Sequence, residues 1–343
     1  MRHSLIVVVL AIGLVAAVAL GADAPAGAAA AGALGADAPG SGGGEEPQRI
    51  STLQAIILGA IQGLTEYLPV SSTGHLILAN YWMDFTRCVD DNHKLTSGFT
   101  KSDAVDAFDI VLHAGTFLAV LGLYRKRVGQ MAKGLVGTDP GGLQLVAALA
   151  LALVPAAVIG YKFKGTIEEN LYNPVTVAAA LAVGGVLMIV VEHYFWRRRP
   201  VRAGVLARKD VPRITDVAQV RLWQALVIGL AQCVAMWPGT SRSMITILAA
   251  LVIGLDMLAA AEFSFLLALP TLGAATLYTA YKDWPELVAH VGPLAMAAGL
   301  VATVIVAALA IKGFVKWLTG HGLLPFGIYR LALAAVVFAY FAM

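Results

Sequence analysis

Long apolar stretches separated by short polar segments follow one another along the chain from residue 51 onward. Each is close to the length of about 20 residues that a helix needs to cross a bilayer. Six of these stretches are predicted to be transmembrane helices, at residues 106–124, 142–162, 174–195, 259–281, 291–311 and 324–342. The pattern therefore predicts an all-α polytopic membrane protein.

Two further apolar segments, at about 53–83 and 222–255, are broken near their middle by Pro, Gly, Ser and Thr. The first break is Leu68-Pro-Val-Ser-Ser-Thr-Gly-His75 and the second is Trp237-Pro-Gly-Thr-Ser-Arg-Ser243. Non-helical backbone inside a membrane is tolerated only where protein or a water-filled cavity surrounds it. Paired broken helices are typical of binding sites near the middle of a membrane. We therefore predict two re-entrant helix hairpins.

The two broken segments also resemble each other in sequence. Gln54, Gly59 and Gln62 are followed 170 residues later by Gln224, Gly229 and Gln232, and Pro69 and Ser72 are followed 169 residues later by Pro238 and Ser241. Three predicted spans, an odd number, separate the hairpins, so the second should have the opposite orientation in the membrane. The expected fold is an inverted repeat of six transmembrane helices and two re-entrant hairpins.

Composition and charge agree with a membrane location. Charged residues make up 13% and hydrophobic residues 59% of the chain, whereas soluble domains contain about 25% charged residues. The net charge of +3 is too small to suggest nucleic acid, and two cysteines exclude a disulfide scaffold. Lys and Arg gather at 125–133, 197–209 and 312–316. The positive-inside rule places these loops in the cytoplasm and the acidic loop 84–106 outside.

The first fifty residues differ from the rest of the chain. Residues 1–22 combine a basic start with an uncharged apolar run and are predicted to be a signal-like or anchor segment. Residues 23–50 are rich in Ala and Gly and are predicted to be a disordered linker. This leaves residues 51–343 as the membrane domain.

The first break carries side chains suited to catalysis. Gln62 and Glu66 are four residues apart, so they share one face of a helix. A carboxylate inside a membrane usually faces a cavity or a partner, so Glu66 is either a functional group or the partner of a buried arginine. Ser71 or Ser72 is placed to cap the next helix. His75 is a candidate general base, nucleophile or acid.

The second break is suited to binding an anion. An arginine at the bilayer centre costs ~2.5–3.5 kcal/mol, so Arg242 is expected to face a polar cavity, where its planar guanidinium suits a phosphate. The alternative is an arginine whose side chain reaches the membrane surface. Ser241 or Thr240 can cap the helix that follows, and Ser243 and Thr246 share one face of it. Free N–H groups and the dipole of a helix start also attract anions.

Inversion would bring the two helix starts together near the middle of the membrane. The hydrogen-bond donors and the cation in these two segments indicate that the site binds an anion. Glu66 also allows a divalent metal to bind, since Mg²⁺ typically uses one or two carboxylates with substrate phosphates. A diphosphate whose lipid tail stays in the bilayer fits this set of groups. An inverted-repeat transporter or flippase and a non-catalytic scaffold are the alternatives. The combination of His75 and Glu66 favours hydrolysis.

The other polar groups of the membrane domain receive simpler interpretations. His113 is predicted to be a core histidine, and Glu192 with His193 to be solvated at an interface. Glu262 is either structural or a support for the site, because a carboxylate suits a helix start. Trp317 is predicted to anchor the chain at a membrane interface.

Both breaks resemble the signatures of the undecaprenyl-diphosphate phosphatase family, the bacitracin-resistance proteins. The first signature matches Gln62-Gly-Leu-Thr-Glu-Tyr-Leu-Pro-Val-Ser-Ser-Thr-Gly-His75, and the second matches Pro238-Gly-Thr-Ser-Arg-Ser-Met-Ile-Thr246. Glu262-Phe-Ser-Phe-Leu-Leu-Ala-Leu-Pro270 and Pro325-Phe-Gly-Ile-Tyr-Arg330 are also similar to family segments. The resemblance covers about residues 52–341.

The resemblance implies a membrane hydrolase that converts undecaprenyl diphosphate to undecaprenyl phosphate and phosphate. This reaction recycles the lipid carrier for peptidoglycan and other envelope polymers and confers bacitracin resistance. The resemblance also implies a multi-pass protein of the bacterial inner membrane, with its active site open to the periplasmic side and a dependence on Mg²⁺ or Ca²⁺. The expected partners are the lipid substrate and the bilayer, with a homodimer as one option.

The resemblance also assigns roles to individual residues. Glu66 and Gln62 would hold the metal, and His75 would activate either Ser72 or a water molecule. The terminal phosphate would be bound by Arg242 and by the hydroxyl groups of Ser71, Ser241, Ser243 and Thr246. Position 62 is Gln where many members have Glu, so one carboxylate is missing, and the loop 84–106 is longer than usual.

Overall fold

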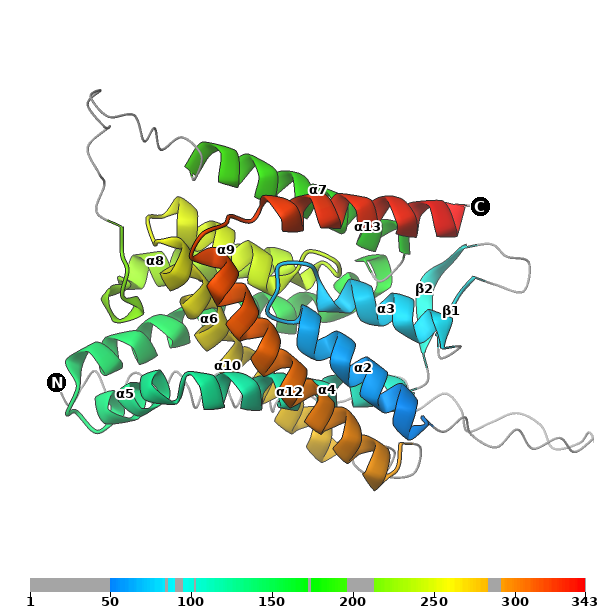
Figure 1. The fold of residues 1–343 in the computed structure, drawn as a ribbon, viewed down its shortest axis with the longest axis horizontal. Coiled ribbons are helices and arrows are strands. Elements are labelled where there is room, and N and C mark those ends of the chain that lie inside the picture. Colours follow the sequence, from blue (N-terminus) through cyan, green and yellow to red (C-terminus); the bar gives the residue numbers. More distant parts are fainter. Residues whose placement is uncertain are drawn as a thin grey trace, which may run out of the picture.

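The structure is a computed structural model that describes residues 50–83, 86–89, 95–101, 103–171, 174–195, 213–282 and 291–342. The segment predicted at 1–22, the linker predicted at 23–50 except its last residue, and the basic loop 197–209 lie outside these residues. That last residue, Ile50, is buried in a hydrophobic core, so it belongs to the membrane domain and not to the linker. In chain order the elements are α2 (Thr52–Thr65), α3 (Ser72–Trp82), β1 (Thr86–Val89), β2 (Leu95–Lys101), α4 (Asp103–Leu123), α5 (Arg125–Leu135), α6 (Pro140–Leu171), α7 (Pro174–Phe195), the 3₁₀ helix η1 (Val217–Gln219), α8 (Leu222–Gln232), the 3₁₀ helix η2 (Cys233–Met236), α9 (Arg242–Val252), α10 (Met257–Lys282), α12 (Pro293–Leu318) and α13 (Leu324–Ala342) (Figure 1).

Each of the six predicted spans is a helix, namely α4, α6, α7, α10, α12 and α13. In the part of the chain that the structure describes, 4 helices are long and apolar enough to cross a membrane: Pro140–Phe163, Val175–His193, Met257–Ala274 and Pro293–Leu318. In α4 and α13 the apolar stretches are shorter, Val111–Leu123 and Leu324–Tyr340. The chain is an all-α polytopic membrane protein, as predicted.

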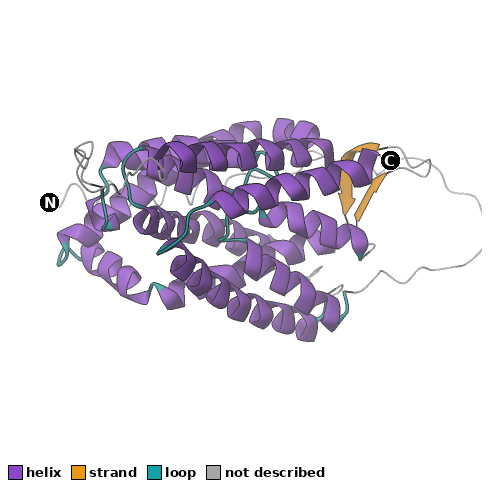
Figure 2. Cartoon of the chain, turned by 45° about the horizontal axis from the view of Figure 1, so that its top comes forward, coloured by secondary structure: helices purple, strands orange, loops and turns teal. Residues whose placement is uncertain are grey.

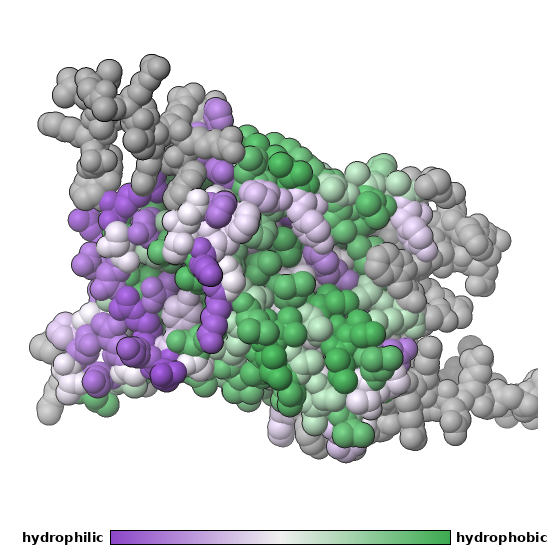
Figure 3. All heavy atoms as spheres, in the orientation of Figure 1, coloured by the Kyte–Doolittle hydropathy of each residue, from purple (hydrophilic) through white to green (hydrophobic). Residues whose placement is uncertain are grey.

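The surface agrees with a membrane setting. Large apolar side chains of α12 face outward, with Leu294 73% and Leu309 64% exposed. Apolar residues cover the middle of the face seen in Figure 3, and hydrophilic residues gather at one end of it. Most helices run along the long axis of the molecule, and the strands lie at one end (Figure 2). Such a belt of apolar side chains is what a bilayer covers.

Both broken segments form a helix, a turn and a second helix, as predicted. The first hairpin is α2 followed by α3, and the second is α8 followed by α9. The hairpins pack in matching ways, α2 against α12 and α8 against α6. A Cβ atom at Gly59 would overlap the carbonyl oxygen of Gly299, and one at Gly229 would overlap the carbonyl oxygen of Ala152. The two glycines that repeat in the sequence therefore serve the same close helix contact in each half.

Two segments predicted as loops contain regular structure. The acidic loop 84–106 includes the antiparallel pair β1 and β2, in which Thr86 pairs with Lys101, and α4 begins at Asp103. The basic segment after α4 forms the helix α5, in which only Gly134 is buried. Lys, Arg, Met, Ala and Leu all favour helices, so the polarity of α5 did not prevent one.

The largest hydrophobic core among the described residues lies where α9 and α10 pack together next to the turn of the first hairpin. Met244 and Ile247 of α9 and Phe263 and Phe265 of α10 are fully or almost fully buried in it. The ring of Tyr67, in the turn after α2, meets the ring of Phe265 edge-on at 5.3 Å between centroids. This core therefore includes a residue of the first hairpin turn, Tyr67, and residues of α9 in the second hairpin.

Candidate active site

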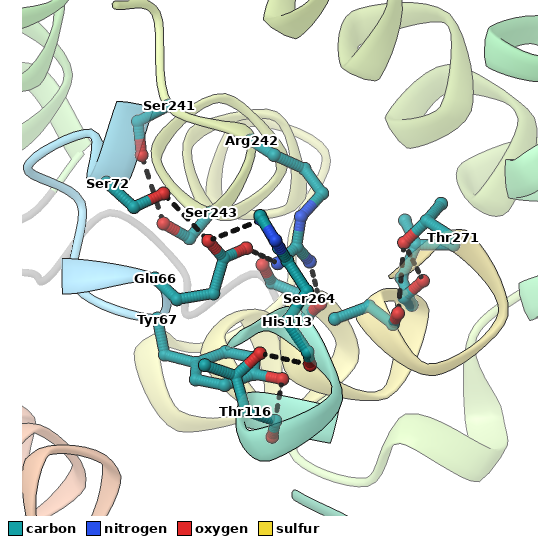
Figure 4. Close-up of polar contacts among 12 residues, drawn as sticks. Glu66, Tyr67, Ser72, His113, Thr116, Ser241, Arg242, Ser243, Ser264 and Thr271 are labelled. Carbon is teal, nitrogen blue, oxygen red and sulfur yellow. Dashed lines mark hydrogen bonds and ion pairs between the residues drawn. The ribbon is translucent and has the colours of Figure 1, made fainter. Parts of the chain in front are cut away.

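The turns of the two hairpins lie against each other (Figure 4). Nη2 of Arg242, the first residue of α9, donates to Oε1 of Glu66 at 2.7 Å. Oγ of Ser243 donates to the carbonyl oxygen of Leu68 at 3.0 Å. The predicted meeting of the two helix starts is therefore confirmed, and it joins side chains that are 176 positions apart in the sequence.

The helices α3 and α9 begin in the same way. Ser71 and Ser241 both have a φ of 73°, and the hydroxyl oxygen of each accepts a hydrogen bond of 3.3 Å from the backbone N–H three residues later. The two capping serines are 170 positions apart, the same separation as Gln62 and Gln232. The predicted match of Ser72 with Ser241 is therefore wrong by one residue, because the structural counterpart of Ser241 is Ser71.

Glu66 lies at the centre of the site and is 7% exposed. Besides Arg242, its carboxylate accepts hydrogen bonds at Oε2 from Ser72 Oγ at 2.7 Å and from Gln62 Nε2 at 3.0 Å. Nε2 of His113 lies 3.6 Å from the same oxygen. A buried carboxylate is stable only when it is paired and hydrogen-bonded, and these donors meet that need. Glu66 is therefore the partner of the partly buried Arg242, and a functional role beyond this pairing stays a prediction.

The guanidinium of Arg242 has further contacts besides its bond to Glu66. It donates to the carbonyl oxygen of Ser264 at 3.3 Å, and its carbon lies 5.9 Å from the centre of the Tyr67 ring. The hydroxyl of Tyr67 in turn donates to the carbonyl oxygen of Thr116 at 3.1 Å. Helices α4 and α10 therefore fix the orientation of Arg242 toward the first hairpin.

Two of the hydroxyl groups predicted to bind phosphate are held by protein neighbours. Ser243 and Thr246 are each 1% exposed. Ser243 Oγ lies 3.0 Å from the Oγ of Ser241, and Thr246 Oγ1 lies 2.7 Å from the Oγ of Ser264. The bond of Thr246 ties α9 to α10, and the bond of Ser243 to the carbonyl oxygen of Leu68 ties α9 to the first hairpin. A contact of either hydroxyl with phosphate stays a prediction.

His75 is bonded to α13 and not to Ser72. Its Nδ1 lies 2.7 Å from the carbonyl oxygen of Ser71, and its Nε2 lies 2.6 Å from the hydroxyl of Tyr329. The two rings are stacked, with 5.7 Å between centroids and 5° between planes. Because a carbonyl oxygen can only accept, Nδ1 carries a proton, and in the neutral ring Nε2 accepts from Tyr329. The hydroxyl of Ser72 points to Glu66 instead.

Three residues at or near the site were not predicted from the sequence to take part in it. His113, predicted to be a core histidine, faces Glu66 from α4. Tyr329 and Arg330 lie in the last segment that resembles the family, but nothing in the spacing of that segment points to His75 or to the hairpins. His113 is a lone histidine in an apolar helix, a pattern that gives no signal of its own.

Two other acidic residues prove to be structural. Glu262 Oε1 lies 2.7 Å from Nε of Arg127, which also lies 2.9 Å from Asp216 through Nη2, so the structural role for Glu262 is observed. Glu192 was expected to be solvated, but it is 6% exposed and accepts a hydrogen bond from the backbone N–H of Leu324. The start of α13 leaves N–H groups without helical partners, which explains why this carboxylate is buried there.

The residues expected to hold a metal fit that role only together with a substrate. Among the described residues, no group of three or more His, Cys, Asp or Glu side chains could hold a metal ion. Oε1 of Gln62 is buried and has no hydrogen-bond partner in this part of the chain, and it is an oxygen of the kind that hard cations bind. Mg²⁺ often takes one carboxylate and completes its shell with water and substrate phosphate. Glu66 and Gln62 fit such a shared site.

Fold and site together define a polytopic helical membrane protein in which two broken-helix hairpins join a carboxylate, an arginine and a serine. The chain belongs to the family described as bacitracin resistance protein BacA, whose model matches residues 55–336. The resemblance stated from the two signatures is therefore confirmed.

Several relatives cover most of the chain. An undecaprenyl-diphosphatase of Sorangium cellulosum is 46% identical over 284 residues, which is 82% of this chain and 84% of the relative. One of Aromatoleum aromaticum is 42% identical, over 83% of this chain and 93% of the relative. The undecaprenyl-diphosphatase 2 of Rhodospirillum rubrum is 40% identical, over 84% of this chain and 95% of the relative.

Proposed function

We propose that this protein is an undecaprenyl-diphosphatase, which hydrolyses undecaprenyl diphosphate to undecaprenyl phosphate and inorganic phosphate. The names of the relatives indicate the reaction. The observation that carries the proposal is the contact of Arg242 and Ser72 with opposite oxygens of the buried Glu66. A cation for phosphate, a hydroxyl and a proton acceptor thus lie together among apolar helices that suit a lipid.

Arg242 and the starts of α3 and α9 are suited to hold the terminal phosphate. A guanidinium can give two parallel hydrogen bonds to phosphate oxygens. The first N–H groups of each helix point out of the helix end and, with the helix dipole, attract an anion. Since both helix starts lie in one site, their effects add at one position. Most of the rate increase in phosphoryl transfer comes from such positioning and charge stabilisation.

The geometry gives Ser72 a proton acceptor. In the covalent route, Ser72 Oγ attacks the terminal phosphorus and its proton passes to Glu66, 2.7 Å away. The bond from that phosphorus to the bridging oxygen breaks, undecaprenyl phosphate leaves, and water then hydrolyses the phosphoserine to release phosphate. In the second route, a water molecule attacks the terminal phosphorus, the bond to the bridging oxygen breaks, and His75 accepts the proton of the water at Nε2 once Tyr329 has released its 2.6 Å hydrogen bond to that nitrogen. Phosphoserine trapped at Ser72 would support the first route.

A divalent cation is the remaining part of the proposal. Glu66 and Gln62 would hold Mg²⁺ or Ca²⁺ together with oxygens of the diphosphate. When bound, such a cation neutralises part of the phosphate charge.

The cellular role follows from the same reaction. Recycling of the lipid carrier would serve peptidoglycan and other envelope polymers and would confer bacitracin resistance. We place the protein in the bacterial inner membrane, with residues 51–343 as the membrane domain and the site open to the periplasmic side. The basic residues of α5, with Arg125 and Lys126 exposed, support a cytoplasmic location for the end of the membrane domain that lies opposite the opening of the site.

A lipid flippase is the second candidate, and the matched hairpins favour it. Paired broken helices with equivalent caps are typical of transporters. A flippase needs a phosphate-binding arginine but no proton acceptor beside a serine. The 2.7 Å bond from Ser72 to Glu66 therefore favours hydrolysis.

The test is phosphate release from undecaprenyl diphosphate by purified protein in detergent, with Mg²⁺ or with EDTA. We expect release with Mg²⁺, and its loss with EDTA and in Arg242→Ala. In His75→Ala, loss is expected if water attacks directly, whereas the covalent route through Ser72 and Glu66 would leave release largely intact. Arg127→Ala is the matched control, since Arg127 also forms a 2.7 Å ion pair but with Glu262, outside the site. It should keep full activity. No release by folded wild-type protein with metal present would reject hydrolysis and make the flippase the leading candidate.

A further inference from the structure

Arg330 of α13 is a buried cation that the proposed reaction does not use. It is 0% exposed and is the largest fully buried side chain among the described residues. Its guanidinium donates to four backbone carbonyl oxygens: Gly239 at 2.8 Å, Ala180 at 3.1 Å, Leu181 at 3.3 Å and Pro69 at 3.5 Å. Three separate segments, the two hairpin turns and α7, therefore converge on one side chain.

Two of these carbonyl groups occupy equivalent places in the two hairpins. Pro69 lies two residues before the capping Ser71, and Gly239 lies two residues before the capping Ser241. The separation of Pro69 and Gly239 is again 170 positions. One guanidinium thus bonds the same backbone position in both halves of the repeat, directly ahead of the two helix starts that form the site.

The surrounding chain leaves room for this side chain. A Cβ atom at Gly184 of α7 would overlap Nη2 of Arg330. Glycine at this position therefore lets the guanidinium reach the carbonyl groups of Ala180 and Leu181 on the same helix. Helices α7 and α13 lie side by side (Figure 1), and Arg330 of α13 forms hydrogen bonds to both turns.

The charge of Arg330 is balanced by dipoles alone. Within the described residues, every acceptor of its hydrogen bonds is a backbone carbonyl, and no carboxylate pairs with it. Burying a charge without a counter-charge is costly unless its hydrogen bonds are satisfied. A residue used only to fill space in this core would be apolar. The positive charge therefore adds to the attraction of the site for an anion, because interactions between charges reach far in a medium of low polarity.

We propose that Arg330 is a positioning residue, which holds the two hairpin turns together so that Arg242 and both helix starts face one phosphate. The proposal rests on the proposed function for the identity of that phosphate. The placement of the turns themselves does not depend on it. Arg330 touches neither Ser72 nor Glu66 through any observed hydrogen bond, so it acts through the turns.

Three variants separate the geometry from the charge. Arg330→Lys keeps the charge but loses the planar fork that reaches several acceptors. Arg330→Met removes both. Gly184→Ala keeps the arginine but displaces its guanidinium. Arg127→Met is the matched control, because it removes an arginine whose observed ion pairs, with Glu262 and Asp216, involve neither hairpin turn.

The first measurement is hydrogen–deuterium exchange of the folded proteins. Faster exchange is expected at residues 71–76 and at 241–246 together in all three variants, and at neither in the control. The second measurement is inhibition of phosphate release by methylenediphosphonate, a headgroup mimic without the tail. Its inhibition constant should rise about tenfold or more in Arg330→Met, and less in Arg330→Lys.

Two outcomes would overturn the proposal. One is exchange that changes in only one turn, or in neither, in a variant that is folded. The other is an unchanged inhibition constant in Arg330→Lys and Gly184→Ala, which would make Arg330 a merely structural residue. If the wild-type protein released no phosphate, the proposed function would fail by itself. The exchange measurement and methylenediphosphonate binding would then still decide the role of Arg330.

Discussion

The pairing of Glu66 with Arg242 predicts a strong energetic coupling between the two hairpins. The charged atoms are 2.7 Å apart, and their side chains are only 6% and 13% exposed. Two unit charges about 4 Å apart attract by about 4 kcal/mol at an effective dielectric constant of about 20. Removal of one partner from a buried pair costs about 3–5 kcal/mol, because the other charge stays buried without compensation.

A double-mutant cycle measures this coupling. Glu66→Gln and Arg242→Met are each expected to lower the free energy of unfolding by about 3–5 kcal/mol. The double variant should be less destabilised than the sum of the two by about 2–3 kcal/mol, since it leaves no unpaired charge. Unfolding can be followed by circular dichroism during SDS titration of mixed micelles. Phosphate release should fall about 10²-fold or more in all three variants, because the phosphate loses its main cation or the serine its acceptor.

The ion pair of Arg127 with Glu262 is the control for this cycle. It has the same 2.7 Å distance, but its side chains are 27% and 20% exposed. Coupling in Arg127→Met with Glu262→Gln should be about 1 kcal/mol or less, with phosphate release unchanged. Additive effects of Glu66→Gln and Arg242→Met would refute the reasoning. So would equal coupling in the two cycles.

Three smaller changes test other parts of the structure. Tyr329→Phe keeps the stacked ring but removes the donor to His75, so the ¹⁵N resonance of Nε2 should shift in labelled protein; an unchanged resonance would contradict the observed bond. Ser71→Ala should cost about 1 kcal/mol in unfolding free energy through loss of the cap, whereas Ser71→Gly should cost less because glycine accepts the positive φ; the reverse order would show that no strain exists there. Gly229→Ala should destabilise by about 1–3 kcal/mol where it meets the backbone of α6, and Gly122→Ala, which has open space, should not; equal melting temperatures would contradict the close contact.

The helices and the meeting of the hairpins could be predicted because the responsible signals are local. Apolar length defines a span, and a Pro, Gly and Ser cluster defines a break in it. The expectation that Glu66 and Arg242 share one site rested on the high cost of isolated charges in a membrane. A buried charge without a partner is costly in every possible fold of the chain. This argument could therefore predict the pairing of the two residues before the fold was known.

Side-chain pairing inside the site could not be predicted in the same way. Ser72 and His75 are near each other along α3, yet one bonds to Glu66 and the other to Tyr329, because helix α13 packs on one side of α3. The position of α13 depends on long-range packing that no local pattern contains. The burial of Glu192 has the same origin, since its partner is the start of α13.

The two halves of the repeat share a backbone plan but differ in chemistry at equivalent positions. The first helical residue after each capping serine is Ser72 in α3 and Arg242 in α9. Both point to the same carboxylate, Ser72 to one oxygen of Glu66 and Arg242 to the other. At the fourth helical position, His75 in the first half is replaced by Ile245 in the second. A symmetric pair of helix starts would offer two equal anion sites. Because the residues at these equivalent positions differ, the two helix starts instead form one site, with a cation on one side and a hydroxyl with its proton acceptor on the other. An asymmetric reaction, in which one bond forms as another breaks, needs that difference.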